Sequence, residues 1–600
     1  MLFPVAYNIR PALNGKNVIY IKVHRYFSDK NVFIIENFGN IYYNIPCSRI
    51  IIFMEGKGMK RTKSIILAAL LIAFSLGLAG CGKKEYEALS TQVIGELDIM
   101  LWSGSGQYMK DIGHQDLTAA DFTGQNEAAV YAMAKEFNKK YPNIKINVYA
   151  KVGDPNGNDT SWVQELENFK AEHGKYPDIY ASTDLAGDVA RGMVADLSVF
   201  KDDPLYQSFN KSIMAMMNYY GFQAGLPQYI LPWGVYVNKE LAENNNIDIP
   251  PVDWTIDEYT AFATAGNNKT FWGAMDIPMS FINTGTKDIN YSLLNYDGSG
   301  KYIDITTEAV TSLLEYIPKW SKSCIWTQYD IGGVPDEIMN TNGWWGYNFF
   351  INNYCLTYDG DPWMMGDAAN PTEGHWGTVK SNDWDIYPRP STDYQPNTIG
   401  IVLDPMAIHN YAMDDGDPAW SDEEKEKLKI AYTFAAFWAG DTESMRARAN
   451  QNFTDNGVEK TCLNDSLPLV TGKAFEEQME IWYSTPTHQR FADEKKMPGF
   501  QKVLELWEKG QFWDVSDKAY PMYVMEDASR VICTYEWTYI YNRDIAGALR
   551  TDPNWLDQVK AKLSDWNEKI NERFRIAEQQ LKDGLREYYG YTDKDFKSDK

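Results

Sequence analysis

The stretch Glu96-Leu97-Asp98-Ile99-Met100-Leu101-Trp102 alternates polar with apolar residues and then becomes apolar, as a strand entering a hydrophobic core does. Residues 128–140 follow it with apolar side chains at helical spacing, and Pro142-Asn143 ends that segment. Ile144-Lys145-Ile146-Asn147-Val148 alternates as a second strand. Strand, helix and strand in this order are the unit of a parallel sheet covered by helices. These residues predict an α/β fold.

The chain continues in the same way toward the C-terminus. Residues 162–172 form an amphipathic segment, and short strands are expected at 177–180 and 234–238. Two capping boxes predict helix starts, at Thr255 with Glu258 and at Ser421 with Glu424. Residues 552–585 carry a charged, periodic pattern that predicts a C-terminal helix, in which a kink or a split is an open alternative. No internal repeat is present.

A secretory signal precedes the first strand. Residues 59–63 are cationic, residues 65–78 form an apolar run, and small residues lead to Cys81. The apolar run has 14 residues, fewer than the ~20 that cross a bilayer as a helix. Leu78-Ala79-Gly80-Cys81 resembles the lipobox of bacterial lipoproteins, in which cleavage exposes a cysteine that is acylated, commonly with palmitate. We expect Cys81 to be the lipidated N-terminus; the alternative is a short signal anchor that contains a cysteine.

Residues 1–58 do not fit a chain whose signal begins at Met59. We interpret them as an over-extended start, with Met59 or Met54 as the initiator, and exclude them from fold reasoning. The alternative is an N-terminal domain, which would be marginal at ~60 residues. Residues 81–95 are expected to be a linker.

Charge excludes two classes of partner. The first 80 residues carry a net charge of +7, which leaves −32 for the rest of the chain. Such a charge repels nucleic acid phosphates and anionic lipid headgroups. Attachment to a membrane would therefore depend on the lipid at Cys81.

Few residues suggest covalent or metal chemistry. Outside the leader the cysteines are Cys324, Cys355, Cys462 and Cys533, which allow three pairings or buried free thiols. Nucleotide, serine hydrolase and zinc motifs are absent from the sequence, so we expect no cofactor and no catalysis.

One stretch has the spacing of a calcium loop. Its oxygen-bearing residues are Asp154, Asn156, Asn158 and Glu165. Asp159 stands where the sharp turn of that loop needs glycine. We interpret the stretch as a polar loop before a helix and predict no metal.

Aromatic residues carry the functional signal. Trp, Tyr and Phe make up 14% of the chain, and several tryptophans follow expected strands in loops rich in Gly, Pro and Asp. Loops at strand ends are where α/β proteins build their sites. Flat rings stack on the apolar faces of pyranose sugars, while carboxylates accept hydrogen bonds from sugar hydroxyls. The loops with this composition contain Trp102, Trp233, Trp345 and Trp363.

Segments in order along the chain resemble the bacterial extracellular solute-binding proteins of family 1, the maltose-binding type. No single segment decides the resemblance; their order does. The segments are residues 141–148, 176–180, 194–197, 225–227, 235–241, 254–258, 356–363, 387–390 and 466–470.

The resemblance implies an α/β fold of the type II periplasmic-binding-protein kind, with two lobes that are each a mainly parallel sheet flanked by helices. Lobe 1 would comprise 96–229 and 390–466, and lobe 2 would comprise 230–389 and 467–600. A monomer of this kind holds a sugar, here an oligosaccharide, in a cleft that closes on it. It then delivers the sugar to an ABC permease at the extracytoplasmic face of the cell membrane, with the ATPase on a separate chain.

The resemblance also implies ligand-binding positions. We expect Trp363 and Trp233 to stack on the ligand, and Asp184 and Asp361 to accept hydrogen bonds from its hydroxyls. Trp102 and Trp345 are further candidates that could equally pack beneath their loops. A secreted carbohydrate-active enzyme and a lipid-anchored adhesin remain alternative functions, and a peptide or polyol remains an alternative ligand.

Overall fold

The structure is a computed structural model, and the residues that it describes fall in two compact units, Met1–Glu85 and Tyr86–Lys600. The described residues are 5–7, 22–25, 33–36, 86–102, 107–151, 162–275, 281, 302–325, 333–343, 345–360, 362–371, 377–416, 419–455, 457–515, 518–519, 523–524, 530–531 and 552–597. In the first unit, strands β1 (Val5–Tyr7), β2 (Lys22–Arg25) and β3 (Phe33–Glu36) form an antiparallel sheet.

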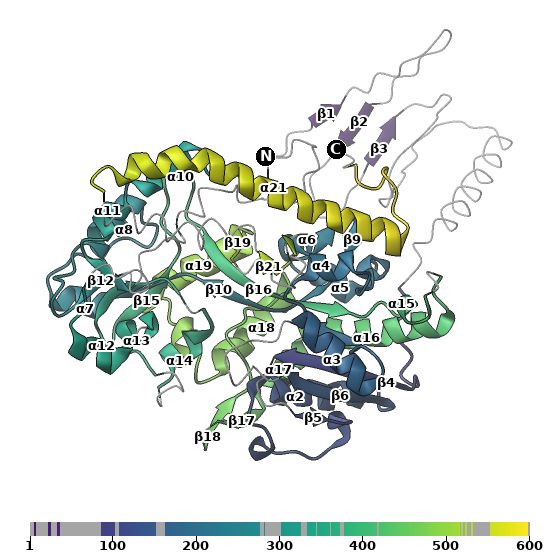
Figure 1. The fold of residues 1–600 in the computed structure, drawn as a ribbon. Coiled ribbons are helices and arrows are strands. Elements are labelled where there is room, and N and C mark those ends of the chain that lie inside the picture. Colours follow the sequence, from purple (N-terminus) through teal and green to yellow (C-terminus); the bar gives the residue numbers. More distant parts are fainter. Residues whose placement is uncertain are drawn as a thin grey trace, which may run out of the picture. The chain divides into compact units, whose positions relative to one another are not determined.

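A seven-stranded sheet organises the first lobe of the second unit (Figure 1). Its order is β10-β16-β7-β4-β6-β5, and β19 pairs with β16 outside this path. Strand β4 is parallel to β6 and β7, whereas β16 runs antiparallel to β7 and β10. The strands are β4 (Gly95–Trp102), β5 (Tyr108–Met109), β6 (Ile144–Lys151), β7 (Ile179–Ala181), β10 (Leu226–Trp233), β16 (Ile399–Ile408) and β19 (Phe512–Asp514).

A five-stranded sheet organises the second lobe, in the order β13-β12-β14-β11-β15. Four of its strands run in one direction, and β11 runs against them. The strands are β11 (Val235–Asn238), β12 (Trp272–Met275), β13 (Cys324–Ile325), β14 (Cys355–Tyr358) and β15 (Trp384–Tyr387).

Helices flank both sheets, as the α/β prediction requires. Those near the first sheet are α2 (Gln125–Lys140), α3 (Trp162–His173), α4 (Leu185–Ala190), α5 (Pro204–Ser208), α6 (Lys211–Met216), α15 (Ala412–Asp415), α16 (Asp422–Gly440) and α17 (Thr442–Ala449). Those near the second are α7 (Lys239–Asn244), α8 (Ile256–Ala263), α10 (Glu308–Leu314), α11 (Ile317–Trp320), α12 (Asp336–Asn342), α13 (Gly346–Ile351) and α14 (Met365–Ala369). The tail contributes α18 (Lys473–Ser484), α19 (Pro498–Glu508) and α21 (Trp555–Tyr589).

The strand directions and the tail differ from the sequence prediction. Both sheets are mixed rather than mainly parallel, because the chain passes between them on strands that run against their neighbours. The expected second-lobe segment 467–600 also contains β19, which pairs with Ile399–Ile401 of β16 in the first sheet. Long-range pairing of this kind leaves no local trace in the sequence.

Predictions from local sequence signals were more accurate than the predicted strand directions. Thr255 and Glu258 satisfy each other's backbone N–H groups at the start of α8, as predicted from their spacing. Ser421 and Glu424 do the same at the start of α16. The predicted C-terminal helix is confirmed as α21, and it is one helix of 35 residues rather than two.

The second sheet separates two hydrophobic cores, because successive side chains along its strands belong to different cores. In β11, Val235 and Val237 join one core while Tyr236, between them, joins the other. Ile386 and Tyr387, successive residues of β15, divide in the same way. Successive side chains of a strand point to opposite faces, so both faces of this sheet are buried.

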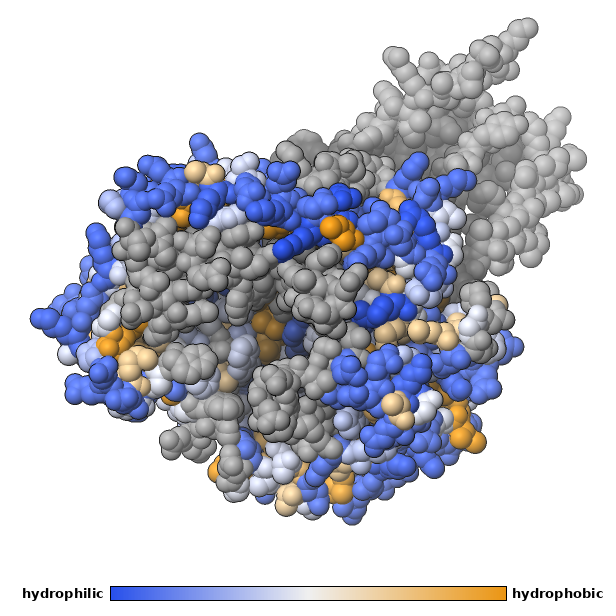
Figure 2. Space-filling view, in the orientation of Figure 1, coloured by the Kyte–Doolittle hydropathy of each residue, from blue (hydrophilic) through white to orange (hydrophobic). Residues whose placement is uncertain are grey.

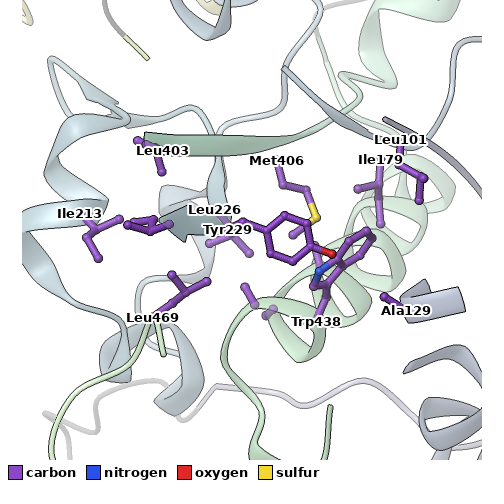
Figure 3. Close-up of a cluster of buried hydrophobic side chains, with 14 of the residues drawn as sticks. Leu101, Ala129, Ile179, Ile213, Leu226, Tyr229, Leu403, Met406, Trp438 and Leu469 are labelled. Atoms are coloured by element: carbon purple, nitrogen blue, oxygen red, sulfur yellow. The ribbon is translucent and has the colours of Figure 1, made fainter. Parts of the chain in front are cut away.

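The larger core lies against the first sheet and α16. Tyr229 of β10 and Trp438 of α16 face one another there, with ring centroids 6.2 Å apart. Met406, Leu226 and Leu469 lie around them (Figure 3). This core also contains Tyr236 and Trp384 of the second sheet, so hydrophobic packing is continuous across the two lobes.

Strands β10 and β16 extend beyond the first sheet as a ribbon. Ala181, the last residue of β7, pairs with Met406, and Met406 also pairs with Leu226 at the start of β10. The ribbon continues from there until Trp233 pairs with Gly400. At ~3.3 Å per residue it reaches about 20 Å past the end of β7. The ribbon carries the chain to the second lobe.

Cysteine and membrane findings complete the fold. Cys324, Cys355 and Cys462 are buried thiols, in agreement with one of the two alternatives from the sequence, and Cys533 lies outside the described residues. Among the residues that the structure describes, no helix is long and apolar enough to cross a membrane. The signal segment and Cys81 also lie outside the described residues.

Candidate functional site

The carboxyl ends of the strands of both sheets converge on the ribbon. Strands β4, β7 and β10 run in one direction, so their carboxyl ends lie on one side of the first sheet. In the second sheet the carboxyl ends of β12 to β15 lie beside the start of β11, which follows β10 after a single residue. In open α/β sheets, ligands bind outside the carboxyl ends of the strands.

Gly234 is the single residue between β10 and β11. A Cβ at this position would lie 2.5 Å from Cγ2 of Ile386 and 2.7 Å from the carbonyl oxygen of Tyr387. Only glycine allows the crossing strand to approach β15 this closely. The position of Trp233 relative to the second sheet is therefore fixed by backbone contact.

Trp233 makes a specific contact with the second lobe. Its indole Nε1 donates a hydrogen bond to Oδ1 of Asp359, at 2.9 Å. Asp359 follows the last residue of β14, and Trp233 ends β10. An indole N–H that is partly buried needs such a partner, and a carboxylate accepts strongly.

Arg389 lies against the same pair. Its side chain is 1% exposed, and its Nη2 lies 3.6 Å from Oδ1 of Asp359. The guanidinium carbon is 5.8 Å from the ring centroid of Trp233 and 4.8 Å from that of Trp513, distances at which a cation is attracted to an aromatic face. Phe281 lies at 6.0 Å.

We call Trp233, Asp359, Arg389 and Trp513 the crossing cluster. Trp513 belongs to β19 and pairs with Gly400, the residue that also pairs with Trp233. Gly400 thus lies between the two tryptophans in the pairing order. The crossing cluster joins the ribbon, β14, the segment after β15 and the tail of the chain. A ligand or a change in lobe angle that moves one of these segments acts on all four.

Trp363 is the most exposed of the predicted stacking residues, at 51% of its surface. It lies in the short helix η5 (Pro362–Met364), which contacts β10 of the ribbon. Its neighbours Pro362 and Met364 are buried, so the turn is anchored while the ring faces outward. Asp361, predicted beside it, lies outside the described residues.

Trp102 and Trp345 differ in exposure. Trp102 ends β4 and is 46% exposed at the carboxyl end of the first sheet. Trp345 precedes α13 and is partly buried, with its ring centroid 5.1 Å from that of Tyr347. Trp345 packs against the larger core, and Trp102 presents a surface ring.

Asp184 is engaged within the protein. It is 2% exposed, and its Oδ1 accepts a hydrogen bond from the backbone N–H of Gly187 at 3.0 Å, which caps α4. Its Oδ2 lies 3.6 Å from Nη1 of Arg191. The structure therefore places this predicted hydroxyl acceptor at the carboxyl end of β7, in a helix cap and an ion pair.

Sequence reasoning missed three members of the crossing cluster as site residues: Asp359, Arg389 and Trp513. A signal for Arg389 was available, because an arginine between two prolines directly after a buried strand is held in a fixed place. Trp513 had none, because it reaches the cluster through the long-range pairing of β19.

A second buried carboxylate lies on β15. Asp385 is 0% exposed, and its oxygens accept hydrogen bonds from the backbone N–H groups of Gly499 at 2.8 Å and Phe500 at 3.1 Å, at the start of α19. Burial raises the pKa of Asp385 to about 6, although these N–H donors act in the opposite direction.

In the described part of the chain, no group of three or more His, Cys, Asp or Glu side chains could hold a metal ion. Of the calcium-loop stretch, Asp154, Asn156 and Asn158 lie outside the described residues, and Glu165 lies in α3.

Part of the chain matches a known protein family. Residues 120–323 match the family described as bacterial extracellular solute-binding protein. This segment is similar to the bacterial extracellular solute-binding proteins. The matched segment runs from α2 to the second sheet and includes Trp233 and the crossing between the lobes.

Individual proteins are similar to this chain at low sequence identity. An uncharacterized ABC transporter extracellular-binding protein of Pyrococcus horikoshii is 25% identical over 377 residues, which cover 58% of this chain and 70% of that protein. An ABC substrate-binding protein from Listeria monocytogenes, solved with cycloalternan, is 16% identical with a TM-score of 0.47, over 83% of this chain and all of its own. A sugar transporter from Rhizobium etli, in an open conformation, is 16% identical with a TM-score of 0.47, over 81% of this chain and 99% of its own.

Proposed function

We propose that this solute-binding protein is a lipid-anchored receptor on the extracytoplasmic face of the cell membrane, which captures an oligosaccharide between its lobes and delivers it to an ABC permease. The observation that carries the proposal is the convergence of the carboxyl ends of both sheets on the ribbon, with Trp233 bonded to Asp359 at that point. The family match over residues 120–323 supports the solute-binding role.

The side chains around the ribbon suit a sugar. Trp363 and Trp102 present exposed rings that can stack on the apolar faces of pyranoses. A row of hydroxyls needs strong acceptors, and carboxylates provide them. Two tryptophans on different lobes suit a ligand of several sugar units better than one of a single unit.

Ligand capture would act through a population shift. A sugar that touches Trp102 of the first lobe and Trp363 of the second makes both contacts only when the lobes are close together. Binding therefore favours the closed arrangement by the difference in affinity between the two arrangements. A permease could then recognise the closed surfaces of both lobes.

A ligand screen by thermal unfolding tests the proposal. The panel contains malto-, xylo- and gluco-oligosaccharides, their monosaccharides, polyols and short peptides. We expect one oligosaccharide series to raise the unfolding temperature, since a ligand at 100 times its Kd stabilises the native state by about 2.7 kcal/mol. Stabilisation by a peptide or polyol alone would reject the sugar, and hydrolysis of the oligosaccharide would reject the receptor role.

A matched pair of variants locates the ligand. Trp363→Ala removes an exposed ring beside the ribbon. Trp420→Ala removes a partly buried ring that packs on Tyr411, just beyond the opposite end of β16. Loss of the thermal shift in Trp363→Ala with its retention in Trp420→Ala supports the site; equal effects contradict it.

A further inference from the structure

The C-terminal helix α21 spans both lobes, as the yellow helix in Figure 1 shows. Its 35 residues extend about 52 Å at 1.5 Å per residue. Most of its side chains on the face seen in Figure 2 are hydrophilic. Its buried apolar residues are Trp555, Val559, Leu563, Trp566, Ile570, Phe574, Ala577, Leu581 and Leu585.

The spacing of those buried residues explains why the helix is straight. Successive members are four, four and three residues apart, so the pattern repeats every 11 residues. An 11-residue repeat has 3.67 residues per turn, close to the 3.6 of an undistorted helix. One apolar stripe therefore stays on one face over the whole length without a kink.

The first part of the stripe packs on the second lobe. The residues from Trp555 to Phe574 belong to the core under α8, α10 and α11. Asn571 fixes this contact, since its Oδ1 accepts from the backbone N–H of Tyr302 at 2.6 Å and its Nδ2 donates to the carbonyl oxygen of Ile303 at 3.0 Å.

The last part packs on the first lobe. Leu581 and Leu585 belong to the larger core, and the hydroxyl of Tyr589 donates to the carbonyl oxygen of Val194 at 2.7 Å. At Gly584 an added Cβ would lie 2.4 Å from the carbonyl oxygen of Ala190 in α4. Glycine is required there because the two helices meet at backbone distance.

Glu578 lies where the two contacts meet. Its side chain is buried, Oε1 accepts a hydrogen bond from the hydroxyl of Tyr220, and Oε2 accepts one from the hydroxyl of Tyr302. Tyr220 belongs to the core of the first lobe and Tyr302 to that of the second. Lys582 lies 3.1 Å from Oε1 and balances the charge.

We infer that α21 acts as a strap, a helix that is attached to both lobes and sets the angle between them. We call Glu578 the latch of this strap, because its two hydrogen bonds reach one lobe each. A rigid helix attached to both lobes cannot follow both when they rotate, so rotation must break the contacts on one side. Each carboxylate oxygen of Glu578 is bonded to one lobe, and loss of either hydroxyl removes the contact between Glu578 and that lobe. The strap is independent of the crossing cluster and of any ligand.

Electron spin distance measurement on the ligand-free full chain tests the strap. Spin labels at Lys139→Cys in α2 and Glu243→Cys in α7 report on the two lobes, with Cys47, Cys81 and Cys533 replaced by serine. The three described native thiols are buried. We expect one narrow distance distribution in the labelled parent, and a broader one or a second population in Glu578→Ala, Tyr302→Phe and Tyr220→Phe.

Glu572→Gln is the matched control, because Glu572 lies on the exposed face of α21 and pairs with Arg575, one turn along the same helix. The two Tyr→Phe variants keep their rings and each remove one hydroxyl, so they carry the test if Glu578→Ala fails to fold. A broad distribution in the parent, unchanged distributions in the latch variants, or equal broadening in Glu572→Gln would each overturn the strap. No sugar is used, so failure of the receptor proposal would leave this result unaffected.

Discussion

Nε1 of Trp233 and Oδ1 of Asp359 lie 2.9 Å apart and join the end of a first-sheet strand to the end of a second-sheet strand. Arg389 lies against both residues and adds a buried cation between two indole rings. The same junction that connects the lobes thus presents aromatic and acidic side chains at the carboxyl ends of both sheets.

Trp363→Ala should weaken oligosaccharide binding with little effect on folding. Removing a stacking ring is expected to lower affinity at least tenfold, or about 1.4 kcal/mol. Because the side chain is 51% exposed, the free energy of unfolding should change by less than about 1 kcal/mol, against ~3–5 for a core tryptophan. Calorimetry and urea unfolding separate the two effects. Unchanged affinity, or a collapsed unfolding midpoint, would remove Trp363 from the site.

Arg389→Met should destabilise the protein by about 3–5 kcal/mol, because it leaves the Asp359 carboxylate, whose side chain is 9% exposed, without the guanidinium. Adding Asp359→Asn should recover part of this loss, since the uncompensated charge is then gone. Urea unfolding of the single and double variants measures the coupling. The Arg389→Lys variant should recover little of the stability lost in Arg389→Met, because a lysine lacks the planar group that lies over Trp513. Additive effects would show that the two residues do not interact.

The Asp385 carboxyl should make stability depend on pH. Its pKa is about 6 in the folded protein and 3.8 in the reference state, so the folded state holds the proton more tightly. Its contribution is therefore complete below pH 4 and is lost as pH rises through 6, by roughly 3 kcal/mol at 1.36 kcal/mol per pKa unit.

Asp385→Asn provides the comparison, since the amide does not titrate. We expect the wild-type stability minus that of the variant to fall between about pH 4 and pH 6, measured by denaturant unfolding at each pH. A difference that is constant over this range would mean that the backbone N–H groups of Gly499 and Phe500 offset the burial.

Cys81→Ala should abolish lipid attachment, because Leu78-Ala79-Gly80-Cys81 is the only lipobox-like stretch in the sequence. Mass spectrometry of detergent-extracted protein from the native host should find acyl chains on Cys81 and no peptides from residues 1–58. An unmodified Cys81 would end the anchor hypothesis, and peptides from 1–58 would end the over-extended start.

The sequence predicted what short segments determine by themselves. Thr255 with Glu258 and Ser421 with Glu424 are local pairs, and each began a helix where expected. The first strand, helix and strand were also found, because their periodicity lies within one window.

Relationships over long separations could not be predicted in the same way. The pairing of β19 with β16, and hence the position of Trp513, depends on residues more than a hundred positions apart. Asp184 illustrates another limit: a carboxylate after a strand can bind a ligand or cap the next helix, and the same residue type serves both. The straightness of α21 was present in its 11-residue spacing, which only a count over the full length reveals.

The order in which the chain supplies strands to the two sheets also determines which sheet can be completed first. All strands of the second sheet come from one continuous stretch, residues 235–387, whereas the first sheet draws strands from 95–233 and again from 399–514. Synthesis therefore supplies every strand of the second sheet before β16 and β19 exist. Until they arrive, β7 presents an unpaired edge, and the high contact order of the first sheet makes its closure slow. The first lobe should therefore be the last part of this protein to mature, and its β7 edge is where a folding factor would protect it.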